Sequence, residues 1–272
     1  MKVLLAVSML MSCLLLSAGE NVLAPRLTGD WERINGSSEI SMIQMDGEAM
    51  LRIRGVGNYR TNAVLPVQPG KIYKLSGEFK AGEGSVPARL FFGMVPLDAK
   101  LKQIASGEVF AIPGTETQLA ADANAGDTVI RIIDGSKWKE NAPFTVAFRT
   151  GPAYSDLPNR NLSPTVKNVS RKNGWHEVTL ASPLKQSYSS GTGVREHRHA
   201  STYPYSAAGN RKLSGEWQEF SAIIKGEAVY GTPLTQWWHG TRNAALLVLA
   251  NSGGNGDSVL LMKNIRLEEL TR

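Results

Sequence analysis

The stretch "GKIYKLSGEFKAG", residues 70–82, decides the fold class of this chain. Tyr73 and Phe79 fall on one side of a two-residue alternation, whereas Lys74 and Glu78 fall on the other. A period of two, with aromatic residues on one side, is typical of a strand that buries one face. We therefore expect a half-buried β-strand here, with Tyr73 and Phe79 directed inward.

The same sequence pattern, typical of β-strands, recurs on both sides of this stretch. Short runs rich in β-branched and aromatic residues are punctuated by glycine and proline: "AMLRIRG" (49–55), "NAVLPV" (62–67), "ARLFFGMVPL" (88–97), "EWQEFSAIIKG" (216–226), "AALLVLANS" (244–252) and "SVLLMKNIRLEEL" (258–270). No stretch of a dozen residues keeps a 3.6-residue apolar period, so crossover helices are not expected. The pattern predicts an all-β protein, and "NSGGNGD" (251–257) predicts a hairpin that places the last strands side by side.

The middle of the chain has a separate series of short strands. "AGDTVIRIIDGSKW" (125–138) combines turn residues with an alternating strand, and "PFTVAFRTG" (143–151) and "GWHEVTLASPL" (174–184) follow it. The strand pattern seen before residue 112 resumes at about residue 213. Surface loops whose ends lie close together tolerate such insertions. We predict a discontinuous domain of residues 20–111 and 213–272, with a small β-rich domain of residues 112–212 inserted into it.

The two flanking halves resemble a known family. "ENVLAP" (20–25) with "GDWER" (29–33), "GKIYKLSGEFKAG", "SGEWQEFSAIIKG" (214–226) and "LLMKNIRLEEL" (260–270) occur in the order seen in carbohydrate-binding modules of families 4, 9 and 22. The resemblance implies a galactose-binding-like jelly-roll β-sandwich that binds glycan on the concave face of one sheet or in the edge loops.

This chain departs from that family pattern in its closing strand. Lys263 and Asn264 stand where an acidic residue is common, which counts against the structural calcium ion of the family. We expect no cofactor and leave only a structural calcium ion open.

The N-terminal residues 1–19 have the layout of a secretory signal peptide. An early lysine precedes an apolar run and then small residues, with cleavage expected near Gly19 and Glu20. The run is too short to favour a permanent membrane span. We expect a secreted, periplasmic or cell-surface bacterial protein. The alternative is lipidation at Cys13, because "LMSC" (10–13) loosely resembles a lipobox. Cys13 is the one cysteine, so cleavage would leave no disulfide and no thiolate nucleophile.

Composition and motifs weigh against several classes of function. The net charge of +6 suits an acidic polymer or an anionic surface, but no basic stripe or nucleic-acid motif is present, so we expect no nucleic-acid partner. His197 and His199 in "REHRH" (195–199) lack the third ligand that a zinc site needs, and we interpret the segment as a charged strand end or loop. No GxSxG elbow occurs. A polysaccharide lyase or glycoside hydrolase is the less favoured alternative, because the acidic residues fall mostly in turns.

Sugars stack their C–H faces on aromatic rings and pair their hydroxyl groups with polar side chains. Segments that combine both residue types supply the candidate ligand-binding residues, together with one further arginine: Tyr59, Arg60 and Asn62; Arg89; Tyr203 and Tyr205; Gln236, Trp237, Trp238, His239 and Arg242. Neighbouring side chains on a strand point to opposite faces, so Trp237 and Trp238 are expected to differ in environment. Pro233 and Gly240 bracket the pair, which favours a loop or strand end at the lip of the jelly-roll cleft. We expect one of these two indoles to pack inward and the other to face ligand.

The expected function is non-catalytic recognition of a polysaccharide. Arg60, Arg89 and Arg242 suggest an anionic polymer, because guanidinium groups hold carboxylates and sulfates through paired hydrogen bonds. The alternative is a structural or adhesion scaffold, with residues 112–212 as a possible surface for a protein partner.

Overall fold

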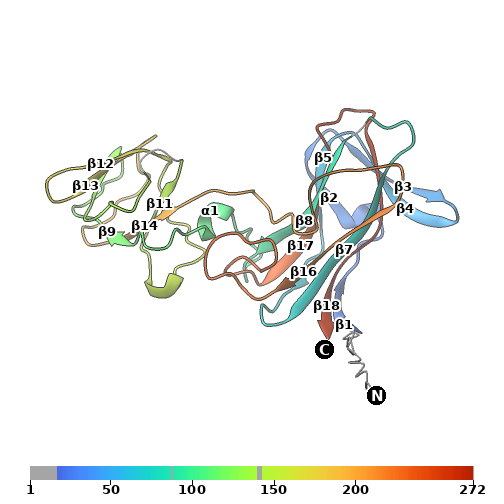
Figure 1. The fold of residues 1–272 in the computed structure, drawn as a ribbon, viewed down its shortest axis with the longest axis horizontal. Coiled ribbons are helices and arrows are strands. Elements are labelled where there is room, and N and C mark those ends of the chain that lie inside the picture. The colour runs from blue at the N-terminus through green and yellow to red at the C-terminus, as the bar shows by residue number, and fades with distance from the viewer. Residues whose placement is uncertain (1–16, 87, 140–142, 272) are drawn as a thin grey trace, which may run out of the picture.

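The computed structural model describes residues 17–86, 88–139 and 143–271 and confirms the expected all-β sandwich (Figure 1). The first sheet has the antiparallel order β16 (Gln218–Lys225), β7 (Ile72–Ala81), β18 (Val259–Thr271), β4 (Glu48–Arg54), β3 (Glu39–Met45), and β1 (Ser17–Leu23) also pairs with β18. The second sheet has the order β15 (Ala208–Lys212), β8 (Arg89–Leu97), β17 (Asn243–Ser252), β5 (Gly57–Thr61), β2 (Trp31–Gly36), and β6 (Leu65–Pro66) pairs with β17. A short 3₁₀ turn, η1 (Thr28–Asp30), precedes β2.

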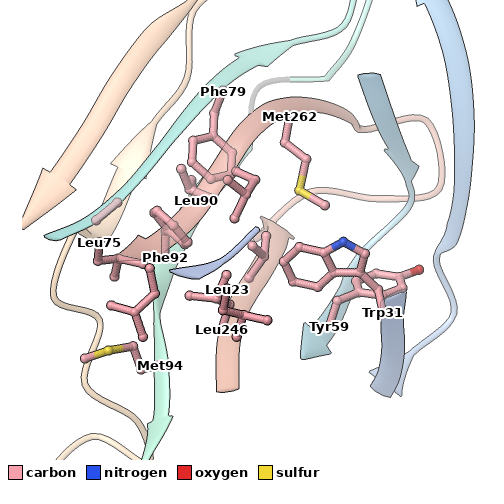
Figure 2. Packing of buried hydrophobic residues seen from close by; sticks show 14 of the residues in the cluster. Leu23, Trp31, Tyr59, Leu75, Phe79, Leu90, Phe92, Met94, Leu246 and Met262 are labelled. Atoms are coloured by element: carbon pink, nitrogen blue, oxygen red, sulfur yellow. The ribbon is translucent and has the colours of Figure 1, made fainter. Parts of the chain in front are cut away.

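The core lies between these two sheets, as the alternation in β7 predicts. Tyr73 and Phe79 are fully buried, and the ring centroids of Phe79 and Phe92 are 5.0 Å apart (Figure 2). Phe92 comes from β8, whose residues at 90, 92 and 94 point into the same cluster. Burying each large apolar side chain contributes about 1.5–3 kcal/mol, so this contact layer fixes the register of both sheets.

The expected hairpin at residues 251–257 is wrong, because this loop crosses from one sheet to the other. β17 lies in the second sheet, whereas β18 lies in the first. The crossing is held by Asn251, whose side-chain amide donates to the backbone oxygens of Ile53, Gly55 and Ser258. A positive φ of 58° at Asn251 gives the corner its sharp bend.

Residues between β8 and β15 form two three-stranded sheets with a hydrophobic core of their own. Their orders are β10 (Val129–Ile132), β13 (His176–Leu180), β12 (Val166–Arg171), and β11 (Thr145–Phe148), β14 (Gly193–His197), β9 (Thr117–Gln118). A 3₁₀ turn, η2 (Pro152–Tyr154), lies between β11 and β12. The core includes Trp138, Phe144 and Phe148, and its members all lie between residues 119 and 194. We call residues 112–199 the insert, and residues 200–207 the return segment. The predicted boundary at residue 212 lies within the sandwich, because β15 pairs with β8 in the second sheet.

The segment 98–110, between β8 and the insert, contacts both parts of the chain, and we call this region the junction. Ile104, Val109 and Trp238 form a small apolar cluster beside α1 (Ser106–Val109). Arg160 from the insert pairs with Asp98 at 2.9 Å and with Glu108 at 3.3 Å.

The segment 195–197 of β14 is fully buried at this junction rather than a charged strand end or loop. The guanidinium of Arg195 lies 2.9 Å from the carboxylate of Asp156 and donates to Nε2 of His197. Nδ1 of His197 in turn donates to the backbone oxygen of Gly107 at 2.7 Å. Both ring nitrogens of His197 are therefore engaged within the protein.

The expected signal peptide falls mostly on residues 1–16, which lie outside the described residues together with Cys13. β1 begins at Ser17 and pairs with the end of β18, so cleavage after Gly19 would remove the first three residues of this strand. None of the helices in the described part of the chain has the length and apolar character needed to cross a bilayer.

Candidate functional site

The outer face of the second sheet, which points away from the core, is the candidate site. The strand register places Leu249 opposite both Phe91 and Asn58, and Leu247 opposite Arg60. Arg60 in turn lies opposite Glu32 on the edge strand β2. Directly paired residues share one face of a sheet. Four strands thus bring apolar and polar side chains together on the same surface.

The chain returning from the insert crosses this outer face at residues 200–207. Its closest approach is at Gly93, where a Cβ atom would lie 2.0 Å from the backbone oxygen of Pro204. Glycine is therefore required at position 93 for this crossing. The return places Tyr203 and Tyr205 over an apolar patch of Val95, Leu97, Ala245 and Leu247.

Residues 200–207 cover one half of the outer face and leave the other half open. The aromatic residues of the site lie at the border between these two halves. The rings of Phe91 and Tyr205 have centroids 4.9 Å apart, and Tyr203 follows at 6.3 Å from Tyr205. All three residues are half-buried, so each is anchored and still accessible. Burial and, secondarily, the neighbouring Tyr203 raise the pKa of Tyr205. Its hydroxyl group therefore remains a hydrogen-bond donor at neutral pH.

Polar groups with spare hydrogen-bonding capacity lie on the same face of the sheet as these rings. Arg60 pairs with Glu32 at 2.9 Å through Nη2, and side-chain exposures of 38% and 48% leave both groups open to solvent. The side-chain oxygen of Asn58 and the hydroxyl group of Ser206 are buried without a hydrogen-bond partner in the part of the chain that the structure describes. Buried polar atoms are normally paired, so we expect ordered water at these two atoms.

Positive charge borders the open half of the face. Arg89 at the start of β8 and Lys212 at the end of β15 lie opposite each other and are exposed. Together with Arg60 they outnumber Glu32, so the surface around the rings attracts anions.

The expectation that Trp237 or Trp238 faces ligand is wrong, because each is only 1% exposed. The two residues lie in the loop between β16 and β17 rather than in a strand. Trp237 enters the sandwich core, edge-on to Tyr73 at 5.2 Å, whereas Trp238 enters the junction with Ile104. Their environments do differ, but both are apolar.

Other predicted residues also lie away from the outer face. Tyr59 is only 1% exposed and shares a hydrogen bond of 2.9 Å with Ser38, so it is a core residue and not a platform. Arg242 pairs with Glu227 at 3.2 Å and His239 Nδ1 lies 3.2 Å from the backbone oxygen of Ala228.

Two more predicted positions also lie away from the rings. Gln236 is half-buried in the same loop as the two tryptophans. Asn62 is exposed just beyond β5 and donates to the backbone oxygen of Gly29 at 2.8 Å. Of the predicted residues, the structure thus brings Arg60, Arg89, Tyr203 and Tyr205 to one face.

Sequence reasoning missed Phe91, Asn58 and Glu32. A signal for Phe91 was available, because two adjacent aromatic residues within a strand must point to opposite faces. Phe91 and Phe92 are such a pair, and Phe92 is the fully buried one. Nothing local distinguishes Glu32, which joins the site only through pairing with β5.

The residues around Lys263 do not fit a calcium ion. The ammonium group of Lys263 contacts Glu48 and lies 3.9 Å from Glu78, and Asn264 donates to Glu78 at 2.7 Å. Calcium needs six to eight oxygen ligands, and here a fixed positive charge already lies between the carboxylates. The described residues contain no group of three or more metal-binding side chains.

Comparison with known proteins gives only structural similarities. No protein-family model and no curated protein matches the chain. It is similar to the xylan-binding domain CBM22-1 of Xyn10C from Paenibacillus barcinonensis, with 11% identity, a TM-score of 0.36, and coverage of 94% of this chain and 97% of that one. It is similar to TmCBM27, a module described as recognising mannan, with 9% identity, a TM-score of 0.30, and coverage of 94% and 99%.

A third similar structure is a family 4 carbohydrate-binding module, with 10% identity, a TM-score of 0.29, and coverage of 89% of this chain and 88% of that one. All three are carbohydrate-binding modules, the class that the sequence resembles. Because identities and TM-scores are low, we assign the site from this chain's own side chains.

Proposed function

We propose that this chain is an exported, non-catalytic protein that binds a polysaccharide on the outer face of its second sheet. The observation that carries the proposal is the half-buried ring pair of Phe91 and Tyr205, 4.9 Å apart, on the same sheet face as Arg60, Glu32 and Asn58. A sugar ring can stack on the aromatic side chains while its hydroxyl groups pair with the polar ones.

The charges on this face favour an anionic polysaccharide. Arg60, Arg89 and Lys212 supply three cationic groups, and guanidinium groups bind carboxylates and sulfates through paired hydrogen bonds. Glu32 is paired with Arg60 at 2.9 Å, which suits both groups to hydrogen-bonding a sugar. General acid–base catalysis would instead need two carboxylates that converge on one ligand.

The test is binding of the chain from residue 20 onward to immobilised polysaccharides, both neutral and acidic. Tyr205→Ala and Phe91→Ala should each weaken binding by about tenfold, the effect of losing roughly 1.4 kcal/mol of ring contact. Tyr230→Ala is the matched control, because Tyr230 is an aromatic residue that is 45% exposed on the loop between β16 and β17. Circular dichroism establishes that each variant is folded.

Two results would contradict the proposal. One is binding that survives the loss of both rings. The other is the absence of binding to any polysaccharide, which would favour a scaffold for protein partners. That alternative has an observation in its support: Val229, Tyr230 and Leu234 form an exposed apolar stretch, 58%, 45% and 49% exposed, on the same loop.

A further inference from the structure

The insert carries an excess of positive charge. Residues 112–199 hold 11 lysine and arginine residues against 8 aspartate and glutamate residues, and the rest of the chain holds 19 against 16. The insert therefore carries +3 of the formal net charge of +6 in about a third of the chain. A charge surplus of this kind attracts polyanions to the surface that carries it.

The sheet β10–β13–β12 presents one face to the insert core and the other to solvent. Ile130, Ile132 and Val178 point into the core. The register pairs Arg131 with Glu177 across β10 and β13, so these two residues share the outer face. In Figure 1 this sheet lies at the end of the molecule farthest from the sandwich, remote from the site around Phe91 and Tyr205.

An aromatic ring with a cation over it lies on this outer face. Trp175 lies just before β13, two residues from Glu177 and on the same side of the strand, and it is half-buried. The guanidinium carbon of Arg131 lies 5.5 Å from the centroid of the indole ring. Such a contact fixes the ring and the cation relative to each other.

The cations on this face outnumber the carboxylates. Glu177 lies between Lys172 at 3.3 Å and Arg131 at 4.0 Å, so one carboxylate faces two cations. The side chain of Arg131 is 54% exposed and that of Lys172 is 46% exposed, which leaves hydrogen-bond donors of both available to a ligand. Val129 and Ile133 add apolar surface, 45% and 51% exposed.

Short polar side chains complete the surface. Asn168 and Thr179 face each other across β12 and β13, and Ser170 lies opposite Glu177. Hydroxyl and amide groups at neighbouring strand positions can pair with successive sugar hydroxyl groups. The face therefore combines a fixed aromatic ring, surplus cations and small hydrogen-bonding groups.

We propose that this outer face of β10–β13–β12 is a second binding surface, specific for an acidic polysaccharide that carries carboxylate or sulfate groups. The sugar ring stacks at Trp175, and Arg131 and Lys172 hold the acidic groups. Charge complementarity selects this occupant: the insert has a net charge of +3, Arg131 and Lys172 outnumber Glu177 on this face, and a neutral polymer would leave the two cations unused. The surface does not depend on the site around Phe91 and Tyr205.

The experiment measures binding of the chain from residue 20 onward to immobilised polygalacturonate and dextran sulfate, with neutral dextran as the blank. Trp175→Ala and Arg131→Gln should each weaken binding to one or both acidic polymers by about 5- to 30-fold, as expected for losing a partly desolvated cation–aromatic site. The polymer whose binding weakens in these variants shows whether the surface holds carboxylate or sulfate groups. Binding should weaken as ionic strength rises, because salt screens exposed charges.

Trp217→Ala is the matched control. Trp217 lies under the ammonium groups of Lys80 at 5.0 Å and Lys263 at 4.8 Å, the same type of contact on the sandwich. This variant should bind both acidic polymers like the unmodified chain. Tyr205→Ala separates the two sites. The affinity that remains in Tyr205→Ala and is lost when Trp175→Ala is added belongs to the insert.

The proposal is overturned if Trp175→Ala and Arg131→Gln, both folded by circular dichroism, bind the acidic polymers as tightly as the unmodified chain. It is equally overturned if Trp217→Ala weakens binding to the same degree, since general charge attraction would then explain retention. No retention on either acidic polymer also refutes it and leaves the insert surface to a protein partner.

Discussion

Protonation of His197 should destabilise the insert and its junction between about pH 6.5 and pH 4. Burial, the largest cause, together with Arg195, lowers the pKa of His197 from 6.5 to about 4, against the raising effects of Gly107 and Asp156. The geometry explains the direction. Nδ1 donates to Gly107, so Nε2 must accept from Arg195, and a proton on Nε2 would face the guanidinium group. The exposed His199 nearby adds a small further lowering.

The sign and size follow from linkage. The unfolded imidazole binds a proton below about pH 6.5, whereas the folded one resists until about pH 4. The unfolded state thus binds more protons within this window, and the free energy of unfolding falls as the pH falls. A shift from 6.5 to about 4 corresponds to about 3 kcal/mol at about 1.4 kcal/mol per pH unit. This contribution is complete above about pH 6.5 and lost at about pH 4.

The Asp156 carboxylate, which pairs with Arg195, acts in a lower range of pH. For Asp156, burial raises the pKa, but hydrogen bonds from Asn159 and Gly151 and the charge of Arg195 bring it below 3.8 overall. Its stabilising effect is therefore lost mainly below the window of His197. The two groups can be separated by pH alone.

The assay is urea unfolding followed by tryptophan fluorescence across this pH range, with His197→Gln as the test variant. The unmodified chain should lose about 3 kcal/mol more stability than His197→Gln on going from about pH 7 to about pH 4. His199→Gln should keep the pH dependence of the unmodified chain. A pH dependence that is the same in His197→Gln and the unmodified chain would refute the reasoning, as would an imidazole of His197 that titrates near pH 6.5 in NMR spectra.

Three further substitutions test other parts of the structure. Trp238→Ala should cost about 3–5 kcal/mol by emptying the apolar cluster at the junction, measured by thermal unfolding; a loss below about 1 kcal/mol would show that the indole is not packed there. Gly93→Ala should displace the return segment, because the new Cβ would lie 2.0 Å from Pro204, and faster proteolysis within residues 200–207 would report it; unchanged proteolysis and stability would contradict the close crossing. Tyr59→Phe should cost about 1 kcal/mol by removing the hydrogen bond to Ser38 without affecting polysaccharide binding, whereas weakened binding would return Tyr59 to the site.

Local pattern was enough for the fold class. The alternation around Tyr73 and Phe79 predicted a strand with one buried face, and both residues are fully buried. Periodicity is a property of the chain itself, since successive side chains of a strand must point to opposite faces. The strand partners were harder to predict: the loop at residues 251–257 resembled a hairpin but joins two sheets, because Asn251 ties it to Ile53 and Gly55.

The candidate site was also predicted only in part. The sequence identified residue types that bind sugars, and Arg60 and Tyr205 do reach one face. It also selected Trp237 and Trp238, with one ring expected to face ligand. The segment is a loop, as Pro233 and Gly240 indicate, but its two rings turn into two different apolar clusters.

By itself, then, the sequence determined the strand-rich class, the faces of individual strands, and the types of residue that can bind a sugar. Tertiary structure alone decided which faces meet. Phe91, Asn58 and Glu32 lie apart along the chain and share one face only through the order β8–β17–β5–β2. Such pairings depend on burial summed over both sheets, and no local stretch of sequence contains that information.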